Sequence, residues 1–195
     1  MFRVPFLVLL TLAIAFGGGI YATQYAIRYS TGFGAISVGA WQAFPKAQTS
    51  DADPYARNHR AKAGQLLLGS AEGLAFSALT DSEGNRFDPA CNYVVSGAIP
   101  TARFWVLTAA DGDNKPLSAG AGLPSAYSSW TALYNKDGSL SFTVSSRAQP
   151  DNWLAVPADR RFKLILTLFD TPAAGNSGLI DLSMPTIEKA GCSDA

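Results

Sequence analysis

The sequence predicts a mainly β protein, an antiparallel sandwich or jelly roll, preceded by one apolar N-terminal helix. An uncharged run fills the chain between Arg3 and Arg28, and turn-forming residues separate short alternating segments after Asp81. The 195 residues include 18 glycines, 11 prolines and 11% aromatic residues, which is typical of a turn-rich β fold. This length is sufficient for one domain with a core, or at most two small ones.

The first predicted element is an apolar segment long enough to cross a membrane. Residues 4–27 are all uncharged, and as a helix they would extend about 36 Å, against a hydrocarbon core of about 30 Å. The alternative is a cleaved secretory signal, because the apolar centre at 4–16 is followed by Gly17-Gly18-Gly19. No clear small-x-small cleavage site follows, which favours an uncleaved transmembrane helix within residues 1–30 whose residues 4–27 contact membrane lipid.

The flanking charges indicate how this helix is oriented. Arg3 and the terminal amine favour the cytoplasmic side, Arg28 opposes them weakly, and Lys46 is the only basic residue between Ser30 and Ala52. We therefore predict a single-pass inner-membrane protein whose domain, residues 31–195, lies in the periplasm. A cleaved signal would place the domain on the same side.

The charge balance excludes some partners. Fifteen basic and fifteen acidic residues give no net charge, and only 15% of the chain is charged. Without Arg3 and Arg28 the chain keeps 13 basic and 15 acidic residues. Because nucleic acids and anionic lipid surfaces attract basic domains, we predict no nucleic-acid partner.

A short helical region is expected before the β structure. Residues 31–45 resemble an entry strand or extended segment, and Asp53-Pro54 then provides a helix N-cap and a first-turn proline. The composition remains compatible with a helix to Leu68, and a second short helical stretch is predicted at residues 71–79.

The remainder of the chain is predicted to be β structure. Candidate strands lie at residues 93–96, 103–108, 125–133, 139–145 and 162–169. No crossover helix separates them, which favours antiparallel pairing. The last of these strands carries apolar residues on both faces, which indicates a central position in its sheet.

Six short motifs carry a resemblance to a known family. They are Gly39-Ala40-Trp41, Asp53-Pro54-Tyr55, Ala71-Glu72-Gly73, Phe104-Trp105-Val106-Leu107-Thr108, Asp137-Gly138-Ser139-Leu140 and Asn152-Trp153-Leu154. Together they resemble the DUF1214 family, over residues 36–188. The resemblance implies a jelly-roll-like antiparallel β-sandwich and, as partner, a DUF1254-domain protein, because the two domains are often fused. It supplies no catalytic residues, and this chain has Ala155 where the family usually continues Asn-Trp-Leu with proline.

The two cysteines, Cys91 and Cys192, are candidates for a disulfide. An even number of cysteines in an exported domain permits pairing, and the bond would close a loop of about a hundred residues. The alternative is two unpaired thiols, one of them buried and the other in a loose tail. The sequence leaves both open.

Polar residues do not form a recognisable catalytic or metal site. His59, the single histidine, accompanies no Gly-x-Ser-x-Gly motif, and an exposed helix residue is the simpler interpretation. Asp111-Gly112-Asp113-Asn114 and Asp137-Gly138 contain oxygen donors but lack the EF-hand spacing, so we interpret both as turns and predict neither a metal nor a cofactor. A glycoside hydrolase would need two nearby carboxylates, for which Glu72, Asp88 and Asp170 are the candidates.

Aromatic residues offer a possible ligand platform. Flat rings bury a large area and carry polar edges, and Trp105, Tyr127 and Trp153 are the residues we select for such a role. A sandwich core would use the same residue types, together with Tyr93, Trp130 and Tyr134. Phe104 and Trp105 are adjacent on a predicted strand, so their side chains must point to opposite faces.

Three functions are consistent with these observations. The first is a membrane-anchored extracytoplasmic domain that binds a protein partner or a cell-envelope component. The alternative is a periplasmic hydrolase that acts on a glycan or another envelope polymer through paired carboxylates. The third is a purely structural envelope module without an exposed aromatic patch.

Overall fold

The computed structural model describes residues 3–29, 35–47, 49, 52–54, 57, 58, 61, 68, 69, 71–174 and 182–192. The chain divides into two compact units, one of residues 1–33 and 51–66 and the other of residues 34–50 and 67–195. The domain boundary predicted at residue 30 stays a prediction.

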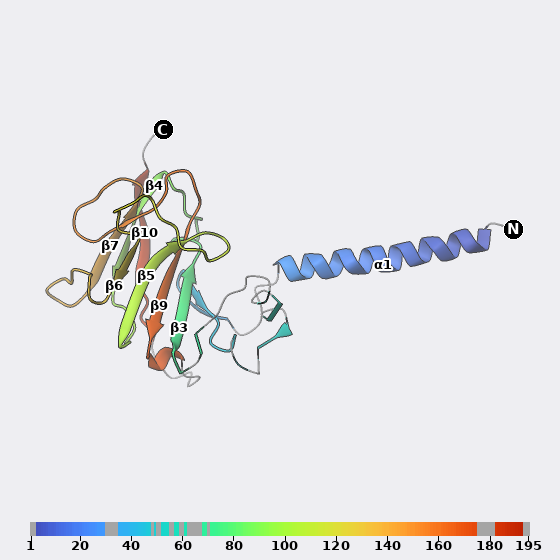
Figure 1. Ribbon diagram of the computed structural model, residues 1–195, viewed down its shortest axis with the longest axis horizontal. Coiled ribbons are helices and arrows are strands. Elements are labelled where there is room, and N and C mark those ends of the chain that lie inside the picture. Colours follow the sequence, from blue (N-terminus) through green and yellow to red (C-terminus); the bar gives the residue numbers. More distant parts are fainter. Residues whose placement is uncertain are drawn as a thin grey trace. The chain divides into compact units, whose positions relative to one another are not determined.

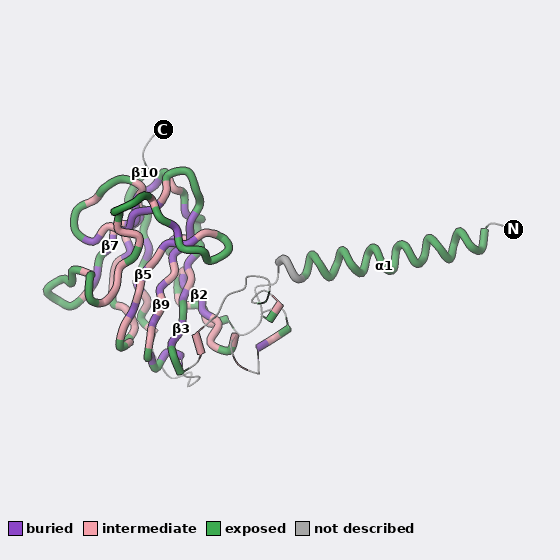
Figure 2. The backbone as a smooth tube through the Cα atoms, viewed as in Figure 1, coloured by how far each residue is buried: buried purple, intermediate pink, exposed green. Residues whose placement is uncertain are grey.

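The first unit contains the apolar helix α1 (Arg3–Tyr29), coloured blue in Figure 1. Its segment Arg3–Ala26 has a mean hydropathy of 2.1, and none of that segment is buried (Figure 2). One helix in the described part of the chain is thus long and apolar enough to be a membrane span or a signal sequence.

The helix predicted after Asp53 lies mostly outside the described residues. Its first turn is present, since the Arg57 amide donates a 3.0 Å hydrogen bond to the Asp53 carbonyl. Pro54, Asn58 and Ala61 are also helical.

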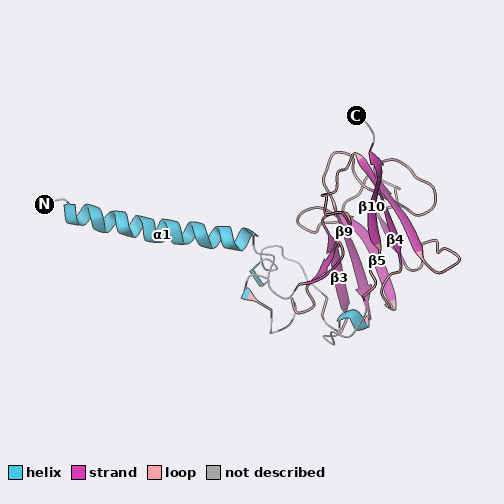
Figure 3. Ribbon diagram, turned by 180° about the vertical axis from the view of Figure 1, so that it is seen from behind, coloured by secondary structure: helices cyan, strands magenta, loops and turns pink. Residues whose placement is uncertain are grey.

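The second unit consists of two β-sheets (Figures 1 and 3). The six-stranded sheet has the order β1-β2-β3-β9-β5-β6, and the four-stranded sheet the order β10-β4-β7-β8. The bounds of the first sheet are β1 (Ile36–Val38), β2 (Trp41–Ala43), β3 (Gly73–Ala78), β9 (Lys163–Phe169), β5 (Phe104–Ala110) and β6 (Ala126–Ser128). Those of the second are β10 (Thr186–Cys192), β4 (Cys91–Gly97), β7 (Leu140–Ser145) and β8 (Trp153–Ala155). A short 3₁₀ helix, η1 (Pro172–Ala174), follows β9.

One hydrophobic core lies between the two sheets (Figure 2). Strand β9 is central, as predicted, because it pairs with β3 on one side and β5 on the other. Its Leu164, Leu166 and Leu168 are buried and face the other sheet. Alternation along the strand therefore gives β9 one fully buried face and one partly exposed face.

The helical stretch predicted at residues 71–79 is wrong, because these residues form β3. Alanine and leucine favour a helix locally, but Leu74, Phe76 and Ala78 alternate with more exposed residues and are buried in the core. Pairing with β2 and β9 thus outweighs the local preference. A helix here would remove one neighbour of the central strand.

The other strand predictions need smaller corrections. The strand expected at 125–133 is only β6, and a turn-rich loop follows it. Sequence patterns did not detect β8 or β10. The sheets are also not purely antiparallel, because β7 and β8 pair in parallel with Thr143 opposite Trp153.

Candidate functional site

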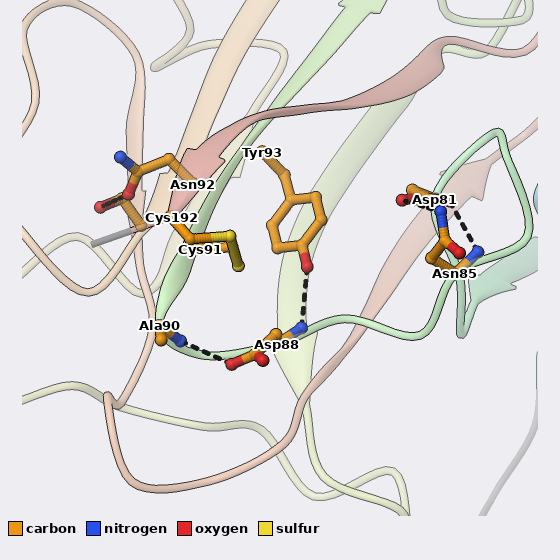
Figure 4. Close-up of a disulfide and its surroundings, with 9 residues drawn as sticks. Asp81, Asn85, Asp88, Ala90, Cys91, Asn92, Tyr93 and Cys192 are labelled. Atoms are coloured by element: carbon orange, nitrogen blue, oxygen red, sulfur yellow. Dashed lines mark hydrogen bonds between the residues drawn. A yellow bond between two sulfur atoms is a disulfide. The ribbon is translucent and has the colours of Figure 1, made fainter. Parts of the chain in front are cut away.

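Cys91 and Cys192 form a disulfide that joins β4 to β10 (Figure 4). The two residues lie opposite each other in the strand register and are 101 residues apart in the sequence. Of the two alternatives that the sequence left open, the structure has the paired one. Strand β10 is an edge strand of the second sheet, and the disulfide ties its last residue, Cys192, to the neighbouring strand. Ile187 is the buried residue of β10.

Tyr93 lies beside the disulfide, and its contacts indicate a structural role. Its ring packs edge-on against Phe87 and Phe162, and its hydroxyl oxygen accepts a 2.8 Å hydrogen bond from the Asp88 amide (Figure 4). Burial raises the pKa of Tyr93 above its ordinary value. Because the hydroxyl is already partnered and its ionisation is disfavoured, Tyr93 stabilises the turn at Asp88 and is a poor base.

Two of the three residues selected as ligand-binding candidates pack against Phe142, and the third, Trp153, is hydrogen-bonded to one of them. The rings of Trp105 and Tyr127 lie 5.9 Å and 5.3 Å from the Phe142 ring. The Tyr127 hydroxyl accepts a 3.1 Å hydrogen bond from the Trp153 amide, and Trp153 Nε1 donates to the Ser145 carbonyl at 3.0 Å. Trp105 is only 5% exposed. The polar groups of Tyr127 and Trp153 are therefore used within the domain, and a ligand role for the three stays a prediction.

Asn152, which precedes Trp153 in the family motif, fastens a loop. Its Oδ1 accepts a 2.8 Å hydrogen bond from the Leu133 amide, and its Nδ2 donates to the carbonyls of Leu133 and Ser141 at 2.7 Å and 3.0 Å. The side chain is buried, so these bonds form away from water. We call residues 129–134 the clamped loop, because Asn152 holds it against β7.

The clamped loop presents large apolar side chains to solvent. Trp130 is 86% exposed, Leu133 is 61% exposed and Tyr134 is 50% exposed. The Tyr134 hydroxyl donates a 3.2 Å hydrogen bond to the Ser129 carbonyl, and the Ser129 amide donates to the Trp105 carbonyl at 3.1 Å. The loop is thus held at both ends while its apolar residues remain open.

Two phenylalanines of the first sheet continue this apolar surface. Phe104 of β5 and Phe169 of β9 are register partners, with ring centroids 5.8 Å apart, and the Trp130 ring lies 5.0 Å from Phe104. Phe104 points away from the core and Trp105 into it, as the alternation required of the pair. We call Phe104, Trp130 and Phe169 the aromatic patch.

An exposed ion pair flanks the aromatic patch. Arg103 Nη1 lies 3.5 Å from Asp170 Oδ2, and each residue is the direct neighbour of a patch phenylalanine. Both side chains are mostly in solvent, so the pair adds little stability.

The carboxylates considered for hydrolysis make local contacts. Glu72 Oε2 accepts the Gly69 amide at 2.8 Å, Asp88 Oδ1 accepts the Ala90 amide at 2.9 Å, and Asp170 is paired with Arg103. All three residues are exposed. Nothing in their described surroundings forms the cleft that a general acid and base would need.

The acidic turns are built by backbone contacts. Asp111 Oδ1 accepts the amides of Asp113 and Lys115, both at 2.9 Å, and the buried Lys163 donates a 3.0 Å hydrogen bond to the Gly112 carbonyl. Burial lowers the pKa of Lys163, and the nearby carboxylates oppose this shift. Asp137 Oδ1 accepts from Ser139 in the same manner, which lowers the pKa of Asp137. These carboxylates serve as turn acceptors, as predicted for both loops.

No group of three His, Cys, Asp or Glu residues that could hold a metal ion occurs in the described part of the chain. His59 lies outside the described residues. A small cavity of about 10 Å³ lies between the sheets and is lined by apolar residues, among them Val95, Phe142 and Leu166. This volume is at the lower limit for one water molecule and the lining offers it no polar partner, so the cavity is not a ligand site.

The fold and the site define a two-sheet β domain with an apolar N-terminal helix and an exposed aromatic patch. The chain belongs to the family described as "Protein of unknown function (DUF1214)", whose model matches residues 72–173. The match begins at Glu72, includes β3 to β9 and ends within η1. No curated protein matches the chain.

Two solved structures are similar to this chain. The VPA0106 protein from Vibrio parahaemolyticus is 22% identical with a TM-score of 0.60, and the match covers 93% of this chain and 45% of that protein. A putative uncharacterized protein from Burkholderia cenocepacia is 17% identical with a TM-score of 0.44, over 77% of this chain and 47% of that one. The first likeness supports the fold, and this chain spans less than half the length of either protein.

Proposed function

We propose that the protein is a membrane-anchored binding module that recognises a protein partner or a cell-envelope component outside the cytoplasm. The observation that carries this proposal is Trp130, a large side chain 86% exposed on a loop that Asn152 holds in place. Large exposed apolar surfaces on soluble domains mark interaction sites. A loop fastened before binding loses little conformational entropy when a partner covers it.

The proposed topology is a single inner-membrane span with the β domain in the periplasm. It is supported by the uncharged run 4–27 of helix α1, by Arg3 at the start of that helix and by the Cys91–Cys192 disulfide, because disulfides persist in oxidising compartments. A jelly-roll-like arrangement of the two sheets is part of the same proposal, and the two sheets around one hydrophobic core support it.

The proposed partner is a DUF1254-domain protein, since family resemblance associates the two domains in one chain. The solved Vibrio parahaemolyticus protein continues well beyond the part that this chain matches. A separate protein would then take the place of the additional segment that the Vibrio parahaemolyticus protein carries in its own chain.

Topology and partnership are tested separately. Reporter fusions at residue 30 and at the C-terminus should both report the periplasmic side, and the two cysteines should resist alkylation in intact cells until a reductant is added. A freely cytoplasmic full-length chain would refute the topology. Co-purification of the full-length chain with a DUF1254-domain protein from the same organism tests the partnership, and a chain that does not bind such a protein would refute it.

A further inference from the structure

The Cys91–Cys192 disulfide ties down an edge strand, β10, whose two halves are held very differently. We propose that this disulfide is a redox-sensitive latch. A protein reductant that carries a dithiol opens it through Cys192, and the outer half of β10, residues 189–192, then leaves β4 while the two sheets stay folded. The latch is independent of the proposed partner and of the aromatic patch.

The inner half of β10 is anchored in the domain. Ile187 is buried in the core, its amide donates a 2.9 Å hydrogen bond to Ser82 Oγ, and its carbonyl accepts the Ser82 amide at 2.9 Å. Just before the strand, the buried Pro185 carbonyl accepts a 2.7 Å hydrogen bond from Trp41 Nε1. None of these contacts involves the disulfide, so they persist when it is broken.

The outer half of β10 has no such anchor among the described residues. Residues 188–192 are all exposed, and a bulge between Lys189 and Gly191 interrupts their pairing with β4. Beyond the bulge, the described contacts with the rest of the domain are two residue pairs and the disulfide. Because a strand end without buried side chains frays readily, the covalent bond is what keeps this end in place.

The β4 side of the disulfide is held from other directions and stays in position. Asn92 Oδ1 accepts a 2.6 Å hydrogen bond from the hydroxyl of Ser145, and β4 pairs with β7 from Tyr93 onwards. The Cys91 amide donates to the Asp88 carbonyl at 3.0 Å (Figure 4). Cleavage of the disulfide therefore displaces β10 and uncovers the edge of β4 at Asn92.

The two cysteines differ in access. Cys91 is only 3% exposed, whereas Cys192 is an exposed residue at the end of the strand. A thiolate of the reductant therefore attacks Cys192 Sγ, the sulfur–sulfur bond breaks, and its electron pair leaves with Cys91 Sγ, which takes up a proton. The second thiolate of the reductant attacks the reductant's own sulfur in the mixed disulfide and releases Cys192, which also takes up a proton. The protein gains two electrons and two protons, and the reductant is oxidised to its disulfide.

The route through Cys192 is tested on the full-length chain in detergent. A thioredoxin variant that keeps only its attacking cysteine should be trapped on the folded chain as a mixed disulfide with Cys192, which peptide mass spectrometry identifies. Trapping on Cys91, or no trapping, would overturn the latch.

The release of the strand end is tested by tryptic cleavage after Lys189. Cys91→Ser/Cys192→Ser, which needs no reductant, should be cleaved there faster than the unaltered chain. Cleavage after Lys136 is the matched control and should not change, because exposed Lys136 lies in the turn before β7, whose first residue pairs with Gly97 at the other end of β4. Faster cleavage confined to Lys189 supports the latch.

Two other cleavage results would overturn the latch. Equal acceleration after Lys189 and Lys136 would mean that the domain unfolds as a whole, and no acceleration would mean that strand pairing alone holds β10. Hydrogen exchange of the unaltered chain after reduction by thioredoxin repeats the comparison without any substitution. The amides of residues 189–192 should lose protection while the Ile187 amide, bound to Ser82, keeps it. Loss of protection at Ile187 as well would contradict the division of the strand.

Discussion

Loss of the Cys91–Cys192 disulfide should destabilise the β domain strongly. The bond closes a loop between residues 101 apart, for which the chain-entropy model gives about 4.7 kcal/mol, an upper value because unfolded chains keep residual structure. Small domains have total stabilities of about 5–15 kcal/mol, so Cys91→Ser/Cys192→Ser should lose up to about a third of the stability at the upper end of that range, and up to most of it at the lower end. The loss should be largest at β10, where Ile187 is the buried residue.

Urea unfolding of the full-length chain in detergent, followed by tryptophan fluorescence, measures this difference. The unaltered chain treated with a reductant should unfold like the double-serine variant, and the reductant should leave the variant unchanged. Limited proteolysis should cut the variant first near β10. A difference below about 1 kcal/mol would contradict the reasoning, because the disulfide would then not constrain the unfolded chain as supposed.

Three further predictions follow from individual contacts. Asn152→Ala should cost about 1–3 kcal/mol in urea unfolding and loosen the clamped loop, seen as faster amide hydrogen exchange at Leu133, because three hydrogen bonds are lost. Gly73→Ala should lower the melting temperature sharply, because a Cβ would collide with the Leu168 carbonyl oxygen, whereas Gly112→Ala should cost far less, since nothing lies near that Cβ and Gly112 has no positive φ. Burial raises the pKa of Tyr93 above 10.0, so the folded state holds the proton longer than the unfolded state, and stability should fall as the pH rises above 10.0. Tyr93→Phe should flatten that part of the pH profile in urea unfolding, and an unchanged profile would refute the assignment.

The sequence predicts best the elements whose periodicity matches their environment. The uncharged run of α1 and the two-sided apolar character of β9 are visible without a structure. Strand β10 could not be found, because a single buried residue, Ile187, leaves no alternating pattern. Strand β8 has only three residues, and β3 is rich in helix-forming alanine and leucine whose pairing partners are distant in sequence.

The exposed surface was harder to predict than the strands. Alternation showed that Phe104 and Trp105 face opposite ways, but only the pairing of the sheets decides that Trp105 is the buried one. The strand predicted at 125–133 includes Trp130, but β6 ends at Ser128 and the turn after it carries Trp130 into solvent. Phe169 gave no signal of its own, since it becomes part of a patch only through its register with Phe104.

The central position of β9 also has consequences for the order of folding. Gly73 pairs with Phe169 and Trp105 pairs with Leu168, which are 96 and 63 residues later in the chain, so both neighbours of β9 wait for a strand that is made much later. The first sheet therefore stays in two parts, β1-β2-β3 and β5-β6, until β9 is made and joins them.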